Sequence, residues 1–366
     1  MEFKYSLPTK ILFGENCIKK HKEEILKFGK KAFIVTGSSS GKLSGALNDI
    51  ISVLDDYDID YLIFDKVLNN PTLENVALGS EKAKDFGADF IIGIGGGSPI
   101  DAAKAIAVLA ANDIKPLDLF TNEFKNKPLP IIAIPTTAGT GSEVTPYSIL
   151  TRKDIETKRS FGNDDTFPKL AIMDPAYTMS LNREVTVNTA VDAFSHGVES
   201  YLSKRSTCVS DIFARQCIIE FASALQALKS DNIDYKTRSK LLYCSMLGGM
   251  AISHTGTTIV HAMGYSLTYF RGIPHGKANG LLMKEFFKFN YSICKAKIDD
   301  ILSIMNMSDI NEFGKVMSDM LNSNLTFSKD ELLNYSGMAM DQKSVLNNAI
   351  QVTKEDLFDI LKNSLL

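Results

Sequence analysis

The chain has 366 residues, of which 45% are hydrophobic and 23% are charged, and its formal net charge is −3. This composition is typical of a globular protein, and the length suits about two domains. The charges form no basic run, which argues against a nucleic-acid partner. No apolar run reaches the roughly 18–20 residues that cross a bilayer, which argues against a membrane partner. The first residues, MEFKYSLPTK, lack the apolar core of a signal peptide, and the five cysteines include no CxxC pair. We therefore expect reduced thiols and a cytoplasmic location.

The first half of the chain alternates β-rich runs with amphipathic helical runs. The expected strands are continuous apolar runs, as is typical of strands buried on both faces. They lie at 32–36, 61–65, 89–95, 129–135 and 169–174, and helices are expected at 42–56, 72–86 and 99–111. This alternation predicts a Rossmann-like α/β domain with a parallel sheet, over residues 1–179.

After about residue 178 the strand-like runs end. Long segments with helical periodicity follow at 184–203, 206–229 and 235–253. We place the domain boundary in the turn-like stretch DPAYTMSLN. The pattern predicts an all-helical domain over residues 180–366.

The segment GIGGGSPIDAAK (93–104) follows an expected strand and begins an expected helix. Close approach of a ligand to the backbone is permitted by three glycines, Gly95, Gly96 and Gly97. We expect Ser98 to be the N-cap, Pro99 to be the first helical residue, and Asp101 to lie at the third position, where its carboxylate caps the amides. Such a helix start binds anions, so we expect a dinucleotide pyrophosphate here. The alternative is a tight turn without a ligand, because a strict GxGxxG motif needs glycine in place of Ser98.

Two further polar loops follow expected strands. In IPTTAGTGSEVT (134–145), the dense hydroxyl groups either satisfy the turn backbone or bind a polar ligand. In TGSSSGK (36–42), the acidic residue that usually binds a ribose 2′-hydroxyl is missing. Gly37, Ser38 and Ser39 leave room for a 2′-phosphate, with Lys42 nearby. This loop predicts NADP(H), and the alternative is a plain serine-rich turn.

Two stretches of the second half carry histidines. In VDAFSHGVES (191–200), Asp192 and His196 are four residues apart and share a helix face, where they either bind a divalent ion or only hydrogen-bond each other. In HAMGYSLTYFRGIPHG (261–276), a turn can bring His275 back toward His261. One carboxylate and three imidazoles suit Fe²⁺ or Zn²⁺ better than Ca²⁺ or Mg²⁺.

Together these segments resemble the iron-containing, metal-dependent (group III) alcohol dehydrogenase family. The matching pieces are GGGSPIDAAK, IPTTAGTGSEVT, DAFSHGVESY and the HAMGY…IPHG pair, and nothing beyond about residue 300 matches sharply. The resemblance implies a dehydroquinate synthase-like fold, in which a Rossmann-like dinucleotide-binding domain precedes an all-α metal-binding domain. It also implies a homodimer.

The resemblance also implies roles for individual residues. The metal would be bound by Asp192, His196, His261 and His275, and the pyrophosphate by Gly95, Gly96, Gly97 and Ser98. The cofactor would also be contacted by Thr136, Thr137 and Thr140, by Lys158 at the ribose, and by Asn70 in the NNPT loop. Family members that prefer NAD often carry Asp where this chain has Gly37, which supports NADP(H).

This chain departs from the family pattern at Tyr265. Some members have a histidine there, which is a candidate for proton relay. Tyr265 either carries the proton through its hydroxyl or only packs, and we favour packing. His254 either lines the substrate pocket or is a satisfied histidine of the core or a helix end, and we favour the second reading.

The resemblance implies an alcohol dehydrogenase or aldehyde reductase that transfers hydride between NADP(H) and a primary alcohol or its aldehyde. The substrate oxygen would bind the metal beside His275 in a cleft between the domains. The alternatives are a glycerol or polyol dehydrogenase, a dehydroquinate synthase-like lyase, and a non-catalytic nucleotide or metal sensor. A small-molecule substrate is the expected partner.

Overall fold

The structure is a computed structural model that describes residues 3–322 and 325–366. The chain forms two compact units. One is Leu7–Leu181, and the other is Asn182–Leu366 together with the first residues as far as Ser6. From the sequence, those first residues were predicted to belong to the α/β domain. In the structure the Tyr5 ring instead stacks on Phe213 of the helical unit, with 5.4 Å between ring centroids.

The unit Leu7–Leu181 is built on a six-stranded parallel sheet in the described chain, with the order β1-β8-β5-β4-β2-β3. The five expected strands are confirmed as β2 (Lys31–Gly37), β3 (Asp60–Val67), β4 (Phe90–Gly95), β5 (Ile131–Pro135) and β8 (Leu170–Met173). The edge strand β1 (Lys10–Phe13) was not predicted. Its four residues KILF are too short to show a periodicity.

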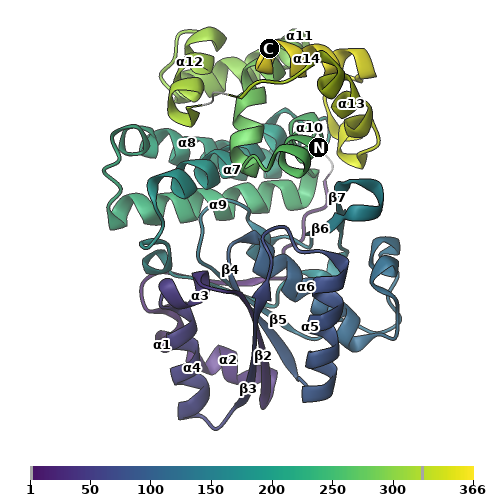
Figure 1. Ribbon diagram of the computed structural model, residues 1–366. Helices are drawn as coiled ribbons and strands as arrows, with labels where there is room; N and C mark the ends of the chain where they lie inside the picture. Colours follow the sequence, from purple (N-terminus) through teal and green to yellow (C-terminus); the bar gives the residue numbers. More distant parts are fainter. Residues whose placement is uncertain (1–2, 323–324) are drawn as a thin grey trace. The chain divides into compact units, whose positions relative to one another are not determined.

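Alternate residues of the central strands face opposite sides of this sheet. Ile34, Ile92 and Ile132 pack with the side that carries α1 (Cys17–Lys20), α2 (Lys22–Ile25) and α4 (Ala46–Asp56). Phe33 and Ile91 pack with α5 (Leu73–Phe86) and α6 (Gly97–Ala111). Figure 1 shows α4 and α5 on opposite faces of the sheet. Both faces are therefore covered, which explains the continuous apolar runs.

The strand order reverses between β2 and β4. The chain passes from β2 outward to β3, and it then returns to β4 on the other side of β2 and continues to β5. In such sheets, ligands bind beyond the carboxyl ends of the strands at the reversal. β2 ends at Gly37 and β4 ends at Gly95, so two of the predicted cofactor loops begin at this point.

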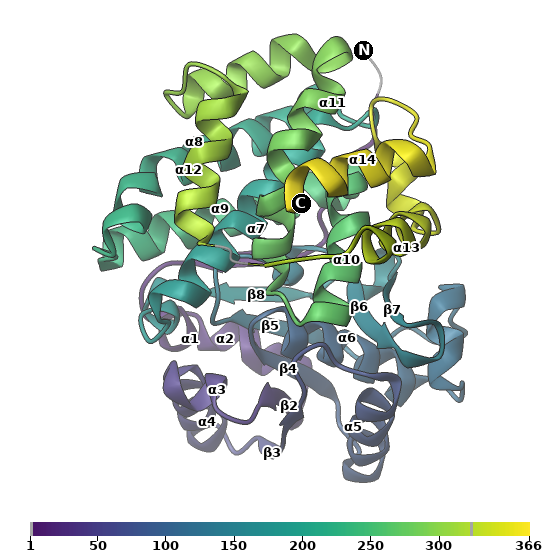
Figure 2. The same ribbon diagram turned by 45° about the horizontal axis from the view of Figure 1, so that its top comes forward.

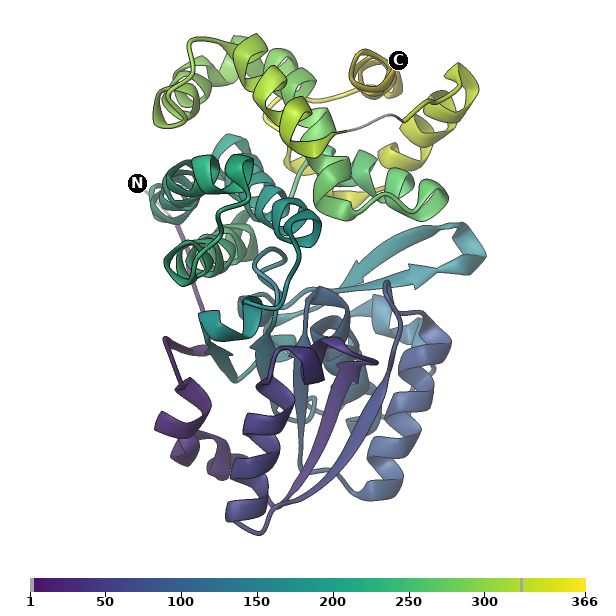
Figure 3. The ribbon, with the colours of Figure 1, turned by 60° about the vertical axis from the view of Figure 1, so that its left-hand side comes forward.

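A two-stranded antiparallel hairpin, β6 (Ser148–Arg152) with β7 (Thr157–Phe161), was also not predicted. Figure 3 shows it as a ribbon separate from the main sheet. Its strands SILTR and TKRSF mix polar and apolar residues, so their sequence resembles a polar loop.

The other unit is helical, as Figure 2 shows, and its described residues form no strand. Its helices are α7 (Arg183–Leu202), α8 (Cys208–Ser230), α9 (Tyr235–Thr255), α10 (Ile259–Arg271), α11 (His275–Ile304), α12 (Ile310–Leu321), α13 (Lys329–Met340) and α14 (Lys354–Leu365). The Asn182 side chain accepts the Val185 amide, which starts α7 directly after the DPAYTMSLN stretch. α7 packs against α8, α9 and α11, so it lies in the centre of the unit. No helix among the described residues is long and apolar enough to cross a bilayer.

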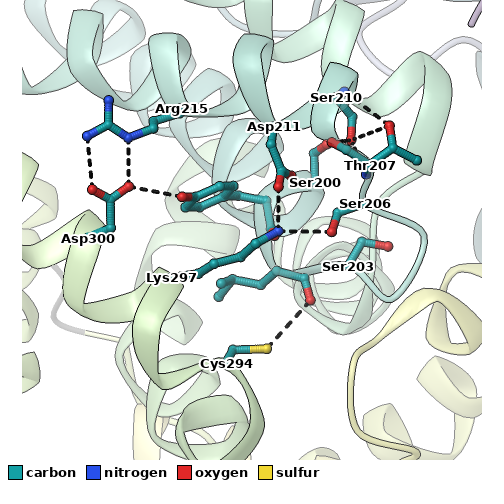
Figure 4. Close-up of polar contacts among 12 residues, drawn as sticks. Ser200, Ser203, Ser206, Thr207, Ser210, Asp211, Arg215, Cys294, Lys297 and Asp300 are labelled. Atoms are coloured by element: carbon teal, nitrogen blue, oxygen red, sulfur yellow. Dashed lines mark hydrogen bonds and ion pairs between the residues drawn. The ribbon is translucent and has the colours of Figure 1, made fainter. Parts of the chain in front are cut away.

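A polar network holds the C-terminal end of α7. The Lys297 ammonium of α11 donates hydrogen bonds to the Tyr201 carbonyl (2.7 Å), Ser206 Oγ (2.9 Å) and Asp211 Oδ2 (2.8 Å). Figure 4 shows the contacts of Lys297 with Ser206 and Asp211. In the same view, Asp300 accepts two hydrogen bonds from Arg215 of α8. The orphan carbonyl at the end of α7 is thus satisfied by a cation, which also suits the helix dipole.

Candidate metal and cofactor sites

Three helices of the helical unit bring a carboxylate and two imidazoles together. Asp192 lies on α7, His261 on α10, and His275 is the first residue of α11. One ligand atom from each of the three lies within 4.8 Å of the others. The predicted turn before His275 is confirmed, because its ring lies 5.0 Å from the His261 ring. This donor set, with one oxygen and two nitrogens, fits Fe²⁺ or Zn²⁺.

His196 lies one helical turn after Asp192 on α7 and is 5% exposed. It does not belong to the group of three converging ligand atoms. Its ring stacks on the His261 ring, with 4.7 Å between centroids and 23° between planes. His196, the fourth predicted ligand, therefore lies beside the three converging residues and not among them.

Glu199 fixes the orientation of His261. Its Oε2 hydrogen-bonds to His261 Nδ1, and its Oε1 accepts from the backbone N–H and the hydroxyl of Thr258 at 2.8 and 2.6 Å. Burial raises the pKa of Glu199, but the neighbouring His261 and the hydrogen bonds outweigh it and lower the pKa below its usual value. A buried carboxylate on Nδ1 leaves Nε2 to face Asp192, whose Oδ1 lies 3.7 Å away. Glu199 was not predicted as part of the site, although it lies three residues after His196 on the same helix.

Tyr265 contacts the same group through its ring. The ring lies parallel to that of His275, with 5.3 Å between centroids and 13° between planes, and the residue is 9% exposed. His254 lies in the last turn of α9, where its Nε2 is 3.3 Å from Thr207 Oγ1 and its ring is 5.9 Å from Tyr5. The geometry of His254 is that of a helix-end histidine in contact with its neighbours.

In the α/β unit, the glycine-rich turn lies against the threonine-rich loop. A Cβ placed on Gly96 would lie 3.1 Å from Thr137 Oγ1, and one on Gly97 would lie 2.7 Å from Thr140 Cγ2. Gly95 has a φ of +146°, which L side chains rarely adopt. Side chains at these positions would crowd Pro99, Thr137 or Thr140, so glycine is what allows the turn to pack closely against the threonine-rich loop.

The predicted cap of this helix is wrong. α6 begins at Gly97, with the extended Gly96 before it and no side-chain cap. Asp101 is 8% exposed and does not bond the helix amides, because its carboxylate accepts from Ser142 Oγ (2.6 Å) and the Ile149 N–H (3.1 Å). The helix therefore begins at Gly97, before the predicted N-cap Ser98, and it has no side-chain cap.

Ser98, Asn70 and Lys158 come together from three segments. Ser98 Oγ accepts from the Asn70 N–H at 3.1 Å, and Asn70 Oδ1 accepts from the Lys158 ammonium at 2.9 Å. Asn70 has a φ of +59°, which asparagine tolerates in a turn. Lys158 lies on β7, so the unpredicted hairpin delivers this cation to the glycine-rich turn.

The serine-rich loop leaves space beyond β2. A Cβ on Gly37 would meet only Ser40 Oγ at 3.4 Å and the Val67 carbonyl at 3.8 Å, which are ordinary contacts. Ser39 precedes the short helix α3 (Ser40–Leu43). Lys42 Nζ lies 3.8 Å from Asp65, and both side chains are exposed. Lys42 is therefore a cation in this loop, although Asp65 offsets part of its charge.

Lys104 is a buried cation that the sequence analysis missed. It is 0% exposed, and its ammonium donates to Ser142 Oγ (2.8 Å) and the Tyr147 carbonyl (2.6 Å). Glu143, which is 1% exposed, belongs to the same charged cluster. Burial raises the pKa of Glu143 to about 7 and lowers that of Lys104 to about 8. Together with Asp101, these residues connect α6 to the loop that carries Thr140.

Comparisons with known proteins show the family of the chain. The family model described as iron-containing alcohol dehydrogenase matches residues 8–175, and the model of the Fe-containing alcohol dehydrogenase family, C-terminal, matches residues 186–365. A crystal structure of an iron-containing alcohol dehydrogenase from Thermotoga maritima is 39% identical with a TM-score of 0.93, over 100% of this chain and 99% of that one.

Two relatives differ in the cofactor that their names give. One is an NADPH-dependent butanol dehydrogenase from Clostridium saccharobutylicum, 33% identical over 78% of this chain and 74% of its own length. The other is NADH-dependent butanol dehydrogenase B from Clostridium acetobutylicum, 32% identical over 79% of this chain and 75% of its own length. The chain belongs to the iron-containing alcohol dehydrogenase family and is an NAD(P)-dependent alcohol dehydrogenase.

Proposed function

We propose that this enzyme interconverts a short primary alcohol and its aldehyde with NADP(H), on a divalent metal held by Asp192, His196, His261 and His275. The observation that carries the proposal is the convergence of Asp192, His261 and His275 from three helices. When bound, the metal would polarise the oxygen of the substrate, and the nicotinamide would donate or accept hydride.

The protein's own residues orient the proposed metal ligands. Glu199 holds His261 in the tautomer whose Nε2 is available to a metal, because its carboxylate takes the Nδ1 side. The parallel ring of Tyr265 limits rotation of the His275 ring, which supports a packing role for Tyr265. A proton relay through its hydroxyl is not needed for this role.

For the cofactor, the glycines at 95–97 and the threonines at 136, 137 and 140 would bind the pyrophosphate side. Asn70, Ser98 and Lys158 form a connected polar group that would contact the ribose. Asp101 would act indirectly, since its carboxylate holds Ser142 of the threonine-rich loop. The preference for NADP(H) is supported by the space at Gly37 and the hydroxyls of Ser38 and Ser39, with Lys42 nearby.

One assay tests the metal and the cofactor together. Metal-stripped protein is reloaded anaerobically with Fe²⁺ and given butanal with NADPH or with NADH, and the loss of cofactor absorbance is followed. We expect iron-dependent oxidation that is faster with NADPH. Faster oxidation of NADH would overturn the cofactor preference, and oxidation that does not depend on metal would overturn the metal site.

The variant Gly37→Asp tests the cofactor preference by itself. The new carboxylate would hydrogen-bond a ribose 2′-hydroxyl and repel a 2′-phosphate. We expect the ratio of kcat/KM for NADPH to that for NADH to fall by roughly tenfold or more, the scale of one charged hydrogen bond. An unchanged ratio would mean that this loop does not contact the ribose.

We also propose that the enzyme is a homodimer, as the family resemblance implies. Sedimentation velocity of the purified enzyme measures this directly. A single species at the monomer mass across the concentration range would overturn it.

A further inference from the structure

A buried asparagine lies between two of the proposed metal ligands. Asn279 is 0% exposed and is located one turn after His275 on α11. Its Nδ2 donates to Asp192 Oδ1 at 3.1 Å and lies 3.2 Å from His261 Nε2. Because Glu199 occupies Nδ1 of His261, its Nε2 can accept from the amide. One NH₂ group thus faces the two atoms that would bind a cation.

The neighbouring helix leaves space for this amide. A Cβ placed on Gly264, in the middle of α10, would lie 2.2 Å from Asn279 Oδ1. Glycine is less favourable than alanine inside a helix. Asn279 Oδ1 is also buried without a hydrogen-bond partner among the described residues. The amide therefore occupies a place that is shaped for it, with its donor group directed at the ligands.

We propose that Asn279 is a positioning residue of the metal site, which holds Asp192 and His261 in converging orientations before the metal binds. The inference rests on the proposed metal site. Without the amide, Asp192 Oδ1 would lose a hydrogen bond in a buried environment, which is unfavourable. The carboxylate would then turn toward other donors, and the ligand group would lose its preorganised geometry.

The two hydrogen bonds respond differently when a cation arrives. A carboxylate oxygen has two lone pairs, so Asp192 can keep the Asn279 bond after one lone pair is given to a metal. An imidazole Nε2 has a single lone pair, so His261 has to release the amide. Asn279 therefore orients Asp192 both before and after the metal binds, but it supports His261 only in the metal-free protein.

The test is the affinity of the metal-stripped, full-length protein for Zn²⁺, measured in competition with a chromogenic chelator. We expect Asn279→Ala to raise the Kd for Zn²⁺ about 10–100-fold, the usual effect of losing a partner of a ligand. Asn279→Leu keeps the branching at Cγ with a larger side chain and removes the donor, so it should give the same loss and serves if the alanine variant fails to fold. A Kd within about threefold of the wild type in the folded variants would overturn the proposal.

Asn290 provides a matched control. It is also 0% exposed on α11, but its amide donates to the Phe286 carbonyl at 3.1 Å and accepts from Asn348 at 3.0 Å. Asn290→Ala should destabilise the protein and leave the Kd for Zn²⁺ unchanged. An equal loss of affinity in this variant would show that any buried asparagine of the helix has the effect, and would overturn the specific role.

A further variant separates this inference from the proposed function. His261→Ala should bind Zn²⁺ far more weakly than the wild type. If His261→Ala binds as well as the wild type, the metal site itself is wrong. If the His261 variant loses binding while the Asn279 variants keep it, only the role of Asn279 is wrong.

Discussion

Glu199 shows how one buried charge determines the chemistry of its neighbour. Its carboxylate is 0% exposed and bonds His261 and Thr258. We expect Glu199→Gln to weaken metal binding about 10–100-fold, because a neutral amide no longer fixes the histidine tautomer. The measurement is the Kd for Zn²⁺. Glu184→Gln, at an exposed position of the same helix, should leave it unchanged.

A second prediction at this scale concerns pH. Burial raises the pKa of Glu143 from 4.5 to about 7. Below pH 4.5 the carboxyl is neutral in both the folded and the unfolded chain. As the pH rises toward 7, the unfolded chain releases the proton first, so this group lowers the free energy of unfolding by up to about 3 kcal/mol.

The variant Glu143→Gln removes this titration. We expect it to be more stable than the wild type by a larger margin at about pH 8 than at about pH 5, as measured by urea unfolding. An equal difference at both values would contradict the raised pKa.

The converging ligands could be predicted at the residue scale, but their supporting residues could not. The breaker GIP before His275 indicates the turn that brings it near His261, and Asp192 and His196 share a helix face by spacing, although only Asp192 belongs to the converging group. Nothing in the spacing shows that Glu199 would meet His261, since that contact depends on the packing of α7 against α10. The sequence also gives no sign of a role for Asn279, because its position opposite Gly264 is seen only in the folded chain.

At the scale of elements, Lys297 connects the end of α7 to α8 and α11. We expect Lys297→Met to lower the free energy of unfolding by about 1.5–3 kcal/mol, because it removes charged hydrogen bonds and leaves the Tyr201 carbonyl unpaired. Lys295→Met is the matched control, because the exposed Lys295–Asp299 pair on the same helix should contribute less than about 1 kcal/mol. Equal effects in urea unfolding would contradict the bridging role.

The elements that sequence predicts are those with strong apolar runs. All five such strands are present, since burial on both faces leaves a clear signal. β1 and the β6–β7 hairpin were missed because they are short or partly polar. The start of α6 was misplaced because Ser98 is the usual cap residue, whereas here Gly96 precedes the helix. The general preference for serine as an N-cap thus does not determine where α6 begins.

At the scale of the whole molecule, each of the two units has its own core and its own proposed ligand. We expect calorimetry to show that Zn²⁺ and NADPH stabilise different transitions, each by about 2.7 kcal/mol at a ligand concentration of 100 times Kd. His261→Ala should abolish only the Zn²⁺ effect. Gly97→Ala, whose Cβ would lie 2.7 Å from Thr140 Cγ2, should reduce only the NADPH effect. A single transition that both ligands shift equally would contradict this assignment.

The stacking of Tyr5 on Phe213 has a consequence for synthesis on the ribosome. Tyr5 precedes the α/β unit in the chain, but its ring partners belong to α8 and α9, which are translated only after that unit. The α/β unit can therefore fold before the ring partners of Tyr5 have been translated. Tyr5 thus leaves the ribosome before the α/β unit and packs only after that unit is complete.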